Sequence, residues 1–306
     1  MRQFPFKKKV GSPRIRPVVQ VETSSMCNVR CIWCLIHYPS VKEDSGLMSL
    51  ENFKKFVDLN VEYFLKTRSN INPYYRGEPL INPSFFDMID YADKAGIRFD
   101  GIHTNLSMKL DTARLMESPI PYIIVNIGGI TEEVHRRAMR GSDLTLVKHN
   151  LRKMLETNIN KSVWLKMNVT KHNYHQVHKL PSFFEALGGN PKEIWVGEIA
   201  FILPSEFSNE RERFFKEVVS EEVKPFLRFR YDTKNNIITK RRNCWFIRPT
   251  ITWDGKVTIC CHDQLNRLNF GNAFKTPLIK IVKDKQYKAA REKGIRMELD
   301  FCKECN

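Results

Sequence analysis

The sequence Cys27-Asn28-Val29-Arg30-Cys31-Ile32-Trp33-Cys34 places three cysteines within eight residues, in the spacing Cys-x3-Cys-x2-Cys. A loop with this spacing can direct one thiolate to each of three metals in a small inorganic cluster. Soft thiolates favour iron–sulfur clusters, zinc or Cu(I) over hard cations. Because a [4Fe–4S] cube takes four ligands, three local cysteines would leave one iron open, which is typical of a reactive metal site.

A zinc site is the alternative, and His37 could be its fourth ligand. The sequence context favours the cluster. Residues 17–23, before the loop, alternate between apolar and polar side chains and therefore predict a strand. Strand and helix patterns then alternate along the following chain, as expected for an α/β protein that carries its metal loop after the first strand.

The chain has 306 residues, enough for one large α/β domain with a small addition. Its net charge of +16 favours anionic partners such as phosphates, nucleotides, nucleic acid or acidic peptides. Residues 1–17 are basic and are expected to form a mobile tail. No secretory signal or membrane span is evident. The eight cysteines lie in two islands, which indicates metal ligation in a reducing compartment, and so a soluble, cytoplasmic protein without membrane contact.

Six strands and their intervening helices follow from the hydrophobic patterns, and they predict a parallel sheet. The expected strands are 18–24, 71–77, 98–105, 122–128, 163–169 and 193–200, and the expected helices are 50–64, 83–95, 112–117, 131–139, 144–156 and 176–187. The predicted fold class is α/β, with an open, partial (β/α)6 barrel at 18–205. A linker helix at 206–240 and a small domain at 241–306, made of a β-hairpin and a helix, complete the predicted organisation.

One face of the predicted strands is persistently polar. In 163–169, Trp164, Lys166 and Asn168 share a face, since side chains alternate along a strand. The other predicted strands also place polar side chains on one face. These residues are Gln20, Glu22, Ser24, Asn72, Tyr74, Arg76, Glu78, His103, Asn105, Asn126 and Glu198. A parallel sheet needs an apolar face only where helices cover it. We therefore expect the polar face to line a lumen that holds a polar ligand, with a solvated sheet face as the alternative.

The cysteine loop, with the aromatic Trp33 before its last cysteine, resembles the signature of the radical S-adenosylmethionine (SAM) family. The resemblance implies that Cys27, Cys31 and Cys34 hold a [4Fe–4S] cluster whose open iron binds SAM. It also implies a reductase partner such as flavodoxin or ferredoxin.

Three later segments resemble SAM-binding motifs of this family. Gly77-Glu78-Pro79 is similar to Gly-Gly-Glu-Pro, with Arg76 in place of the first glycine; Gly77 would admit the methionine part of SAM and Glu78 would receive its amino group. Asn126-Ile127-Gly128-Gly129 is similar to Ser-x-Asp-Gly, although Gly128 replaces the acid. Arg140-Gly141-Ser142 is similar to a segment whose arginine meets the SAM carboxylate, with a surface charge as the alternative. The expected cofactor-binding residues are thus Trp33, Gly77, Glu78, Asn105, Asn126, Arg140 and Asn168.

The second cysteine island resembles the SPASM/twitch extension of radical SAM enzymes. A full SPASM domain with two auxiliary clusters needs about seven cysteines, whereas this island has five. The resemblance implies one auxiliary [4Fe–4S] cluster, held by Cys244, Cys260, Cys302 and Cys305, with a four-cysteine zinc site as the alternative. Cys261 could replace Cys260 as ligand, face the substrate as a free thiol, or be a small buried side chain.

The resemblance implies that a 5′-deoxyadenosyl radical takes hydrogen from a substrate. Two functions follow from it, and the positive net charge suggests a third of a different class. The first is dehydrogenation of a small polar substrate, such as a sugar, an aminocyclitol or a nucleotide-linked sugar that could carry phosphate. Candidate bases for it are Lys166, Arg76, His103 and Glu22. The second is a peptide maturase or epimerase with Cys261 as hydrogen donor, against which the short segment before the first strand argues, because it cannot form a leader-binding domain. The third is a zinc-stapled nucleic-acid-binding protein, although nucleic acid is not the expected partner.

Overall fold

The computed structural model describes residues 17–34, 36, 45–157, 159, 161–197, 217–220, 222–223, 230–232, 237–239, 244, 247–260, 263 and 265–303. The N-terminal part alternates strands and helices: β1 (Val18–Val21), α2 (Leu50–Thr67), β3 (Asn70–Asn72), α3 (Phe85–Lys94), β4 (Ile102–Thr104), α4 (Thr112–Glu117), β5 (Tyr122–Ile127), α5 (Glu132–Ala138), α6 (Leu144–Glu156), β7 (Ser162–Asn168), α7 (Leu180–Glu185) and β8 (Ile194–Gly197). Two short strands, β2 (Arg30–Cys31) and β6 (Met139–Arg140), lie outside this series.

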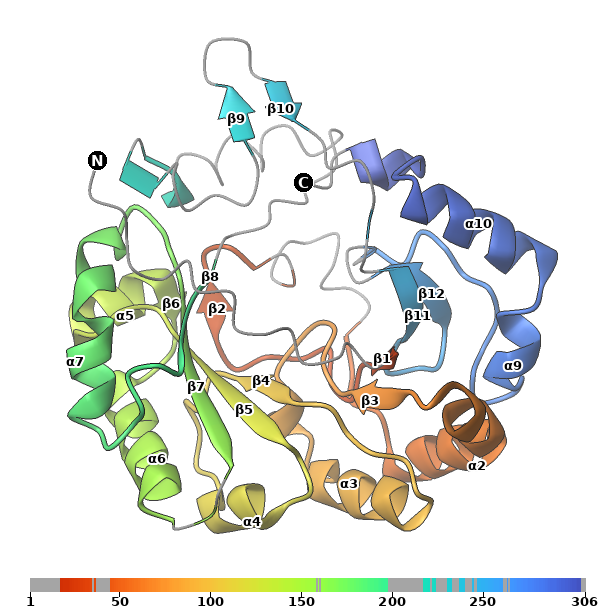
Figure 1. Ribbon diagram of the computed structural model, residues 1–306, viewed down its shortest axis with the longest axis horizontal. Helices are drawn as coiled ribbons and strands as arrows, with labels where there is room; N and C mark the ends of the chain where they lie inside the picture. The colour runs from red at the N-terminus through yellow and green to blue at the C-terminus, as the bar shows by residue number, and fades with distance from the viewer. Residues whose placement is uncertain are drawn as a thin grey trace.

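The six main strands run parallel in chain order. β1 pairs with β3, and β4, β5, β7 and β8 form a second parallel sheet. A parallel bridge between Ile71 and Phe99 connects the two sheets. Figure 1 shows α2, α3, α4, α6 and α7 along the outer side of the curved strands. The predicted partial (β/α)6 barrel is therefore confirmed.

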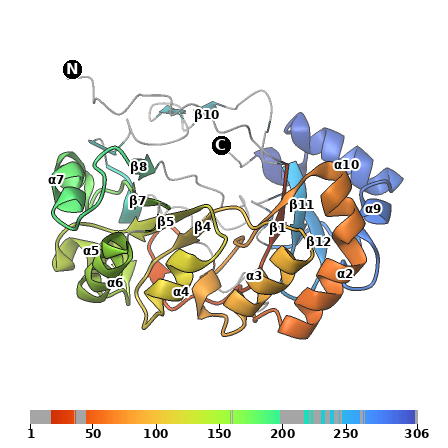
Figure 2. The ribbon, with the colours of Figure 1, turned by 60° about the horizontal axis from the view of Figure 1, so that its bottom comes forward.

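The C-terminal part contains β9 (Arg230–Asp232), β10 (Ile237–Thr239), β11 (Ile247–Ile251), β12 (Val257–Cys260), α9 (Leu278–Ile281) and α10 (Lys285–Ile295). β11 and β12 form the expected hairpin, whose turn uses Gly255 at φ +89°. β11 also pairs in parallel with β1, where Gln20 lies opposite Thr250 and Val21 opposite Ile251. The hairpin therefore continues the barrel sheet beyond β1, as Figure 2 shows.

The barrel core lies between the strands and the outer helices. α2 buries Phe53, Phe56, Val57 and Phe64 on one face, and the Phe53 ring packs 6.1 Å from that of Phe99. β7 buries Val163, Leu165 and Met167 toward the helices. This is the apolar face that helix-covered parallel strands need. No helix among the described residues is long and apolar enough to cross a membrane.

Several element boundaries differ from the sequence-based expectation. The second strand ends at Asn72, since Pro73 follows and has no N–H for the ladder, so Tyr74, Arg76 and Glu78 lie in a loop rather than on an alternating strand face. The helix expected at 176–187 begins as a 3-10 turn, η3 (Tyr174–Lys179), before α7. The last helix is broken because Asp284 caps a new start, accepting the N–H groups of Gln286 and Tyr287. The tail at 1–16 and most of the predicted linker helix lie outside the described residues.

Candidate active site

The three cysteines of the N-terminal loop lie together after β1. Burial raises the pKa of Cys31 well above its usual value, and the neighbouring Cys34 and Cys27 thiols raise it further. Burial, with the Glu78 charge next in size, raises the pKa of Cys27 to about 12. Such thiols are protonated at neutral pH and need positive charge nearby to become thiolates. A bound metal cluster would supply that charge, so the donor set fits the predicted ligand role.

The cysteine loop is attached to the chain segment that follows α5. β2 pairs antiparallel with β6, so that Cys31 lies opposite Met139 and Arg30 opposite Arg140. The Ile32 N–H also donates to the Ala138 carbonyl at 3.0 Å. These backbone hydrogen bonds fix the middle cysteine to the barrel independently of any metal.

Gly77 brings the loop after β3 into contact with the start of the cysteine loop. Its φ is +72°, and a Cβ there would lie 2.5 Å from the carbonyl oxygens of both Ser24 and Met26. The next residue, Glu78, donates its N–H to the Met26 carbonyl at 2.8 Å. Only glycine fits such a close approach without displacing backbone. Gly77 is therefore needed to hold Glu78 beside Cys27.

The Glu78 carboxylate is buried next to the cysteines. Its oxygens accept the backbone N–H groups of Asn105 at 2.8 Å and Leu80 at 3.2 Å. Burial nevertheless raises the pKa of Glu78 to about 7. The Asn105 amide lies 3.0 Å from Asn28 Oδ1 and 3.8 Å from Cys27 Sγ. The structure thus brings Glu78 and Asn105 together with Cys27, and an ammonium group would favour the ionised carboxylate here.

Polar and aromatic side chains from four neighbouring parts of the sheet meet on the inner face. The Lys166 ammonium lies 4.2 Å from the centroid of the Trp195 ring. The His103 ring lies 5.7 Å from Trp195 and 4.5 Å from Tyr74. Burial and the Lys166 charge lower the pKa of His103 well below its usual value, so that this imidazole is neutral at pH 7. This supports the predicted lumen.

Asn168, on the same strand as Lys166, has a buried side-chain oxygen with no hydrogen-bond partner among the residues that the structure describes. A Cβ on Gly197, in the neighbouring strand, would lie 2.2 Å from that oxygen, so glycine leaves the room that Asn168 needs. Buried acceptors without a partner are rare in folded proteins. Asn168 Oδ1 is therefore well suited to accept a hydrogen bond from a bound ligand.

The remaining predicted cofactor-binding residues lie apart from this centre or contact it indirectly. Trp33 is partly buried against the core, and the Asn126 amide donates to the Thr104 carbonyl at 3.3 Å. Arg140 is half exposed and lies 3.3 Å from Glu217. Its contact with the SAM carboxylate stays a prediction, as do the roles of Trp33 and Asn126.

Two of the four candidate bases are committed to each other. Arg76 Nε lies 2.7 Å from Glu22 Oε1 and its Nη2 lies 2.9 Å from Oε2, and both side chains are fully buried. Such a bidentate pair leaves neither group available as a base. Lys166 and His103 remain, since both lie on the inner face.

His135 is a buried polar residue of this region that sequence reasoning missed. Its Nδ1 accepts the Gly128 N–H at 3.1 Å, which places the ring proton on Nε2, and Nε2 donates to Ser142 Oγ at 2.7 Å. His135 thereby connects the two segments expected to bind SAM, 126–129 and 140–142. The available signal was its position three residues before Ala138, which places both residues on one face of the short helix α5, the face that is buried.

His135 makes stability depend on pH. Burial lowers its pKa to about 4, whereas the unfolded chain takes up a proton near 6.5. Its stabilising contribution is therefore complete above pH 6.5 and falls as the pH falls toward 4, by about 3 kcal/mol over the whole window. Urea unfolding between pH 7.5 and 5 should show a smaller loss of stability in His135→Gln than in the native protein. The exposed His175→Gln is the control, and equal pH slopes in all three proteins would contradict this account.

The described C-terminal cysteines lie within one compact unit. Cys260 ends β12 and Cys302 lies in η6 (Asp300–Lys303), and both are buried. The Cys244 N–H donates to the Ile295 carbonyl at the end of α10. Cys261 and Cys305 lie outside the described residues, so the ligand set of the auxiliary cluster stays a prediction. Within the described part of the chain, no three His, Cys, Asp or Glu side chains are arranged around a single metal ion.

Two family models match this chain. The model of the radical SAM superfamily matches residues 21–183, and that of the SPASM iron–sulfur cluster-binding domain matches residues 243–306. The chain belongs to the radical SAM superfamily. It is therefore an enzyme of the class that uses SAM with [4Fe–4S] clusters. The predicted family, domain type and cofactors are confirmed, and iron is favoured over the zinc alternatives.

Curated relatives of this radical SAM chain match in part. The mycofactocin maturase MftC of Mycobacterium ulcerans is 25% identical over 171 residues, which cover 55% of this chain and 44% of MftC. A cofactor-modifying protein for the tungsten-containing aldehyde ferredoxin oxidoreductase of Pyrococcus furiosus is 27% identical over 180 residues, which cover 55% of this chain and 48% of that protein. The matches span less than half the length of these relatives.

Solved structures of other radical SAM enzymes share the fold. BtrN in complex with AdoMet and 2-DOIA superposes with a TM-score of 0.60 and 16% identity over 96% of this chain and 94% of its own. The enzyme anSMEcpe with bound AdoMet superposes with a TM-score of 0.62 and 15% identity, over 94% of this chain and 88% of its own. SuiB of Streptococcus suis, bound to the precursor peptide SuiA, superposes with a TM-score of 0.58 and 14% identity, over 94% of this chain and 69% of its own. At these identities the similarity concerns the fold alone.

Proposed function

We propose that this radical SAM enzyme modifies a peptide. The observation that carries the proposal is the sequence similarity to mycofactocin maturases, which are 25–29% identical over 123–171 residues. Two enzymes of the same fold, SuiB and anSMEcpe, have peptides bound in their solved structures. The sequence alone favoured dehydrogenation of a small polar substrate over peptide modification. We now place peptide modification first.

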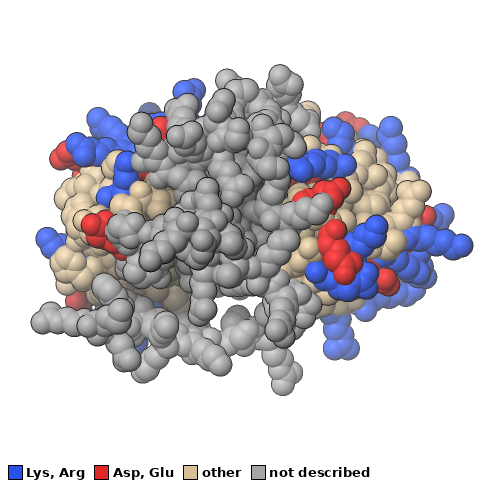
Figure 3. Space-filling view, turned by 90° about the horizontal axis from the view of Figure 1, so that it is seen from above, with Lys and Arg blue, Asp and Glu red and all other residues tan. Residues whose placement is uncertain are grey.

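Surface charge supports an acidic macromolecular partner. Exposed cations gather on α9 and α10, and Figure 3 shows Lys and Arg side chains along that side of the molecule. The exposed residues are Lys280, Lys283, Lys285, Lys288, Arg291 and Lys293. Such a face attracts anionic groups at moderate ionic strength. It suits an acidic peptide segment or an acidic reductase such as a flavodoxin.

The inner face gives the chain's residues distinct roles in this proposal. Cys27, Cys31 and Cys34 would hold the cluster and Glu78 would pair with the amino group of SAM. When bound, the two cofactors supply a 5′-deoxyadenosyl radical that takes a hydrogen atom from the substrate. Lys166, which lies beside the Trp195 ring, would orient the substrate or hold a proton at Nζ. The neutral imidazole of His103 could accept a proton in its place.

Dehydrogenation of a small polar substrate is the second candidate. It is favoured by the near full-length match to BtrN in complex with AdoMet and 2-DOIA, which covers 96% of this chain and 94% of BtrN. The polar inner face also suits a hydroxylated ligand. In this case the remaining candidate bases would remove the proton of the alcohol that is oxidised.

Substrate-dependent formation of 5′-deoxyadenosine decides between these functions. Anaerobic enzyme with reconstituted iron–sulfur clusters is incubated with dithionite, SAM and either short peptides encoded beside the gene or a panel of sugars and aminocyclitols. We expect a peptide to raise 5′-deoxyadenosine formation and to change in mass or take up deuterium from D2O. Stimulation by sugars alone, with formation of a carbonyl product, would overturn the peptide proposal.

Replacing Cys261 with alanine distinguishes epimerisation from the other peptide reactions. If its thiol returns a hydrogen atom to the peptide, Cys261→Ala should still consume SAM but give no epimerised product. A maturase that oxidises the peptide should keep its product yield in this variant. The adjacent Cys260→Ala is the comparison, since loss of a cluster ligand should lower bound iron as well as activity.

A further inference from the structure

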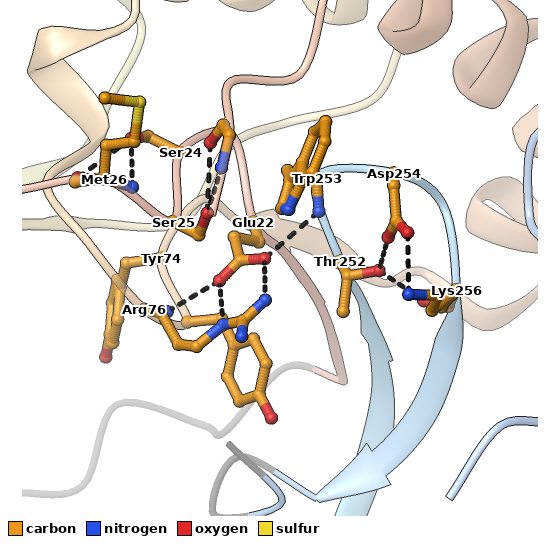
Figure 4. A network of polar contacts seen from close by, with 12 residues as sticks. Glu22, Ser24, Ser25, Met26, Tyr74, Arg76, Thr252, Trp253, Asp254 and Lys256 are labelled. Carbon is orange, nitrogen blue, oxygen red and sulfur yellow. Dashed lines mark hydrogen bonds and ion pairs between the residues drawn. The ribbon is translucent and has the colours of Figure 1, made fainter. Parts of the chain in front are cut away.

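A buried ion pair joins the SAM-binding loop to the C-terminal hairpin. The Glu22 carboxylate, at the end of β1, binds the Arg76 guanidinium through both oxygens and accepts the Arg76 backbone N–H at 3.2 Å. The same carboxylate accepts the backbone N–H of Trp253, in the turn between β11 and β12, at 3.1 Å. Figure 4 shows Arg76 and Trp253, from two separate parts of the chain, both in contact with Glu22. Arg76 stands where the related motif carries its first glycine.

The hairpin turn also touches the segment next to the N-terminal cysteines. A Cβ on Gly46 would lie 2.7 Å from the Trp253 ring, so the indole packs directly against that backbone. Gly46 in turn exchanges hydrogen bonds with Ser25, two residues before Cys27. The hairpin is thus held from two sides close to the predicted SAM-binding cluster.

Tyr75, adjacent to Arg76, reaches the loop of Cys260. Its hydroxyl donates to the Asp263 backbone carbonyl, and its ring lies 5.5 Å from the Arg76 guanidinium. Tyr75 therefore contacts the C-terminal unit directly, and the next residue, Arg76, reaches it through Glu22.

Asp263 organises the chain after Cys260. Its N–H donates to the Cys260 carbonyl at 3.2 Å, and its carboxylate accepts the Thr258 hydroxyl at 2.8 Å. The carboxylate also accepts the backbone N–H groups of Arg267 and Leu268, each at 2.9 Å. The Asp263 carbonyl also accepts the Asn266 N–H at 2.9 Å, so the Tyr75 hydrogen bond to this carbonyl bears on Asp263 and on residues 265–268 after Cys260.

We propose that Tyr75 and Arg76 are positioning residues that hold the auxiliary-cluster loop at a fixed place relative to the SAM site. Only three peptide bonds separate Tyr75 from Glu78, and Gly77 between them packs against the cysteine loop. Few backbone dihedral angles can therefore absorb a movement of Asp263 before it changes the position of Glu78. Hydrogen bonds around the ligands of a metal cluster tune its potential. Both the geometry and the electronic properties of the auxiliary cluster should therefore depend on these residues.

Tyr75→Phe tests the proposal with little risk to folding, since it removes one hydroxyl and keeps the ring. The experiment uses reconstituted protein that also carries Cys27→Ala, Cys31→Ala and Cys34→Ala, so that only an auxiliary cluster contributes to the spectra. We expect unchanged bound iron, an altered electron paramagnetic resonance line shape, and about a tenfold change in the equilibrium constant of reduction, which is about 59 mV for one electron. Amide hydrogen exchange should also become faster at residues 265–268.

Tyr287→Phe is the matched control. The Tyr287 hydroxyl is also buried in the C-terminal unit but has no hydrogen-bond partner among the described residues, so its removal breaks no hydrogen bond to them. We expect its spectrum, potential and amide exchange to match those of the parent. If Tyr75→Phe also matches the parent in all three, the positioning role of Tyr75 is wrong. Absence of any cluster in the parent would instead show that the auxiliary cluster itself was wrongly predicted.

The ion pair is tested with both partners replaced by apolar residues of similar size, Glu22→Leu with Arg76→Met. Removing one partner alone would leave a buried charge unpaired and strongly destabilise the fold, whereas apolar replacement of both is tolerated in other proteins. With the N-terminal cysteines intact, we expect the folded double variant to form 5′-deoxyadenosine in excess over product, because the two centres are no longer held together. A parental ratio of 5′-deoxyadenosine to product, together with a parental auxiliary-cluster potential, would contradict the role of Arg76.

Discussion

Replacing Cys27, Cys31 or Cys34 with alanine should abolish SAM cleavage, whichever of the three is changed. The thiols are close enough to raise one another's pKa, and the loop that carries them is bonded to the barrel through β2 and β6. An alanine leaves two thiolates, which cannot keep a cube with one open iron in place. 5′-Deoxyadenosine should fall below detection in a dithionite assay, and bound iron should fall by the content of one cluster.

The C-terminal cysteines provide the control for this experiment. Cys244→Ala should lower bound iron by a similar amount, yet it should leave measurable SAM cleavage, because its backbone is held at the end of α10 rather than in the N-terminal loop. Product formation should still fail in this variant. Full SAM cleavage after loss of Cys31 would show that the three thiols do not hold the cluster that cleaves SAM.

The N-terminal site was predictable because its chemistry is local in the sequence. Three thiols within one loop, and a glycine next to a carboxylate in the loop after a strand, are patterns that a few neighbouring residues define completely. The structure places Gly77 and Glu78 against the residues before Cys27, and the contact of these two residues with SAM stays a prediction. Hydrophobic periodicity likewise predicted the barrel strands, because each strand buries its outer face under a helix.

The contacts that connect the two parts of the chain were not predictable in this way. Glu22 binds Arg76 and Trp253, which lie 54 and 231 positions away, and no periodic pattern marks such partners. The sequence motif suggested that Arg76 is only a departure from a glycine, whereas the structure shows it in a buried ion pair. The parallel pairing of β11 with β1 is equally non-local, since a hairpin signal says nothing about which edge the hairpin joins.

Glu78→Gln should weaken SAM binding more than any other change that leaves the cluster in place. In the proposed site the buried carboxylate would pair with the ammonium group of SAM, and loss of one partner of a buried charged pair costs about 2–5 kcal/mol. This corresponds to a dissociation constant raised roughly 30- to 4,000-fold. Bound iron should not change, because Glu78 is not a cluster ligand. Equilibrium binding of SAM to the anaerobic protein measures the effect.

The pH dependence of SAM binding provides an independent test of the same pair. Burial raises the pKa of Glu78 to about 7, so the carboxyl group is protonated below that pH and must lose its proton before it can pair with an ammonium group. The affinity should therefore be highest between pH 7 and the pKa of an α-amino group, which is about 8, and it should fall by up to about tenfold per pH unit below pH 7. The native protein should show this decline between pH 7 and 5.5, and Glu78→Gln should not.

An exposed carboxylate supplies the control for Glu78. Glu62→Gln removes a negative charge on the outer face of α2, where Glu62 pairs with Lys66, and should leave both the affinity for SAM and its pH dependence unchanged. In Glu78→Gln the new amide group would also face one of the two backbone N–H groups that the Glu78 carboxylate accepts, so thermal unfolding of the variant must be measured alongside. A folded Glu78→Gln protein with native affinity and the native decline below pH 7 would show that the SAM amino group is held elsewhere.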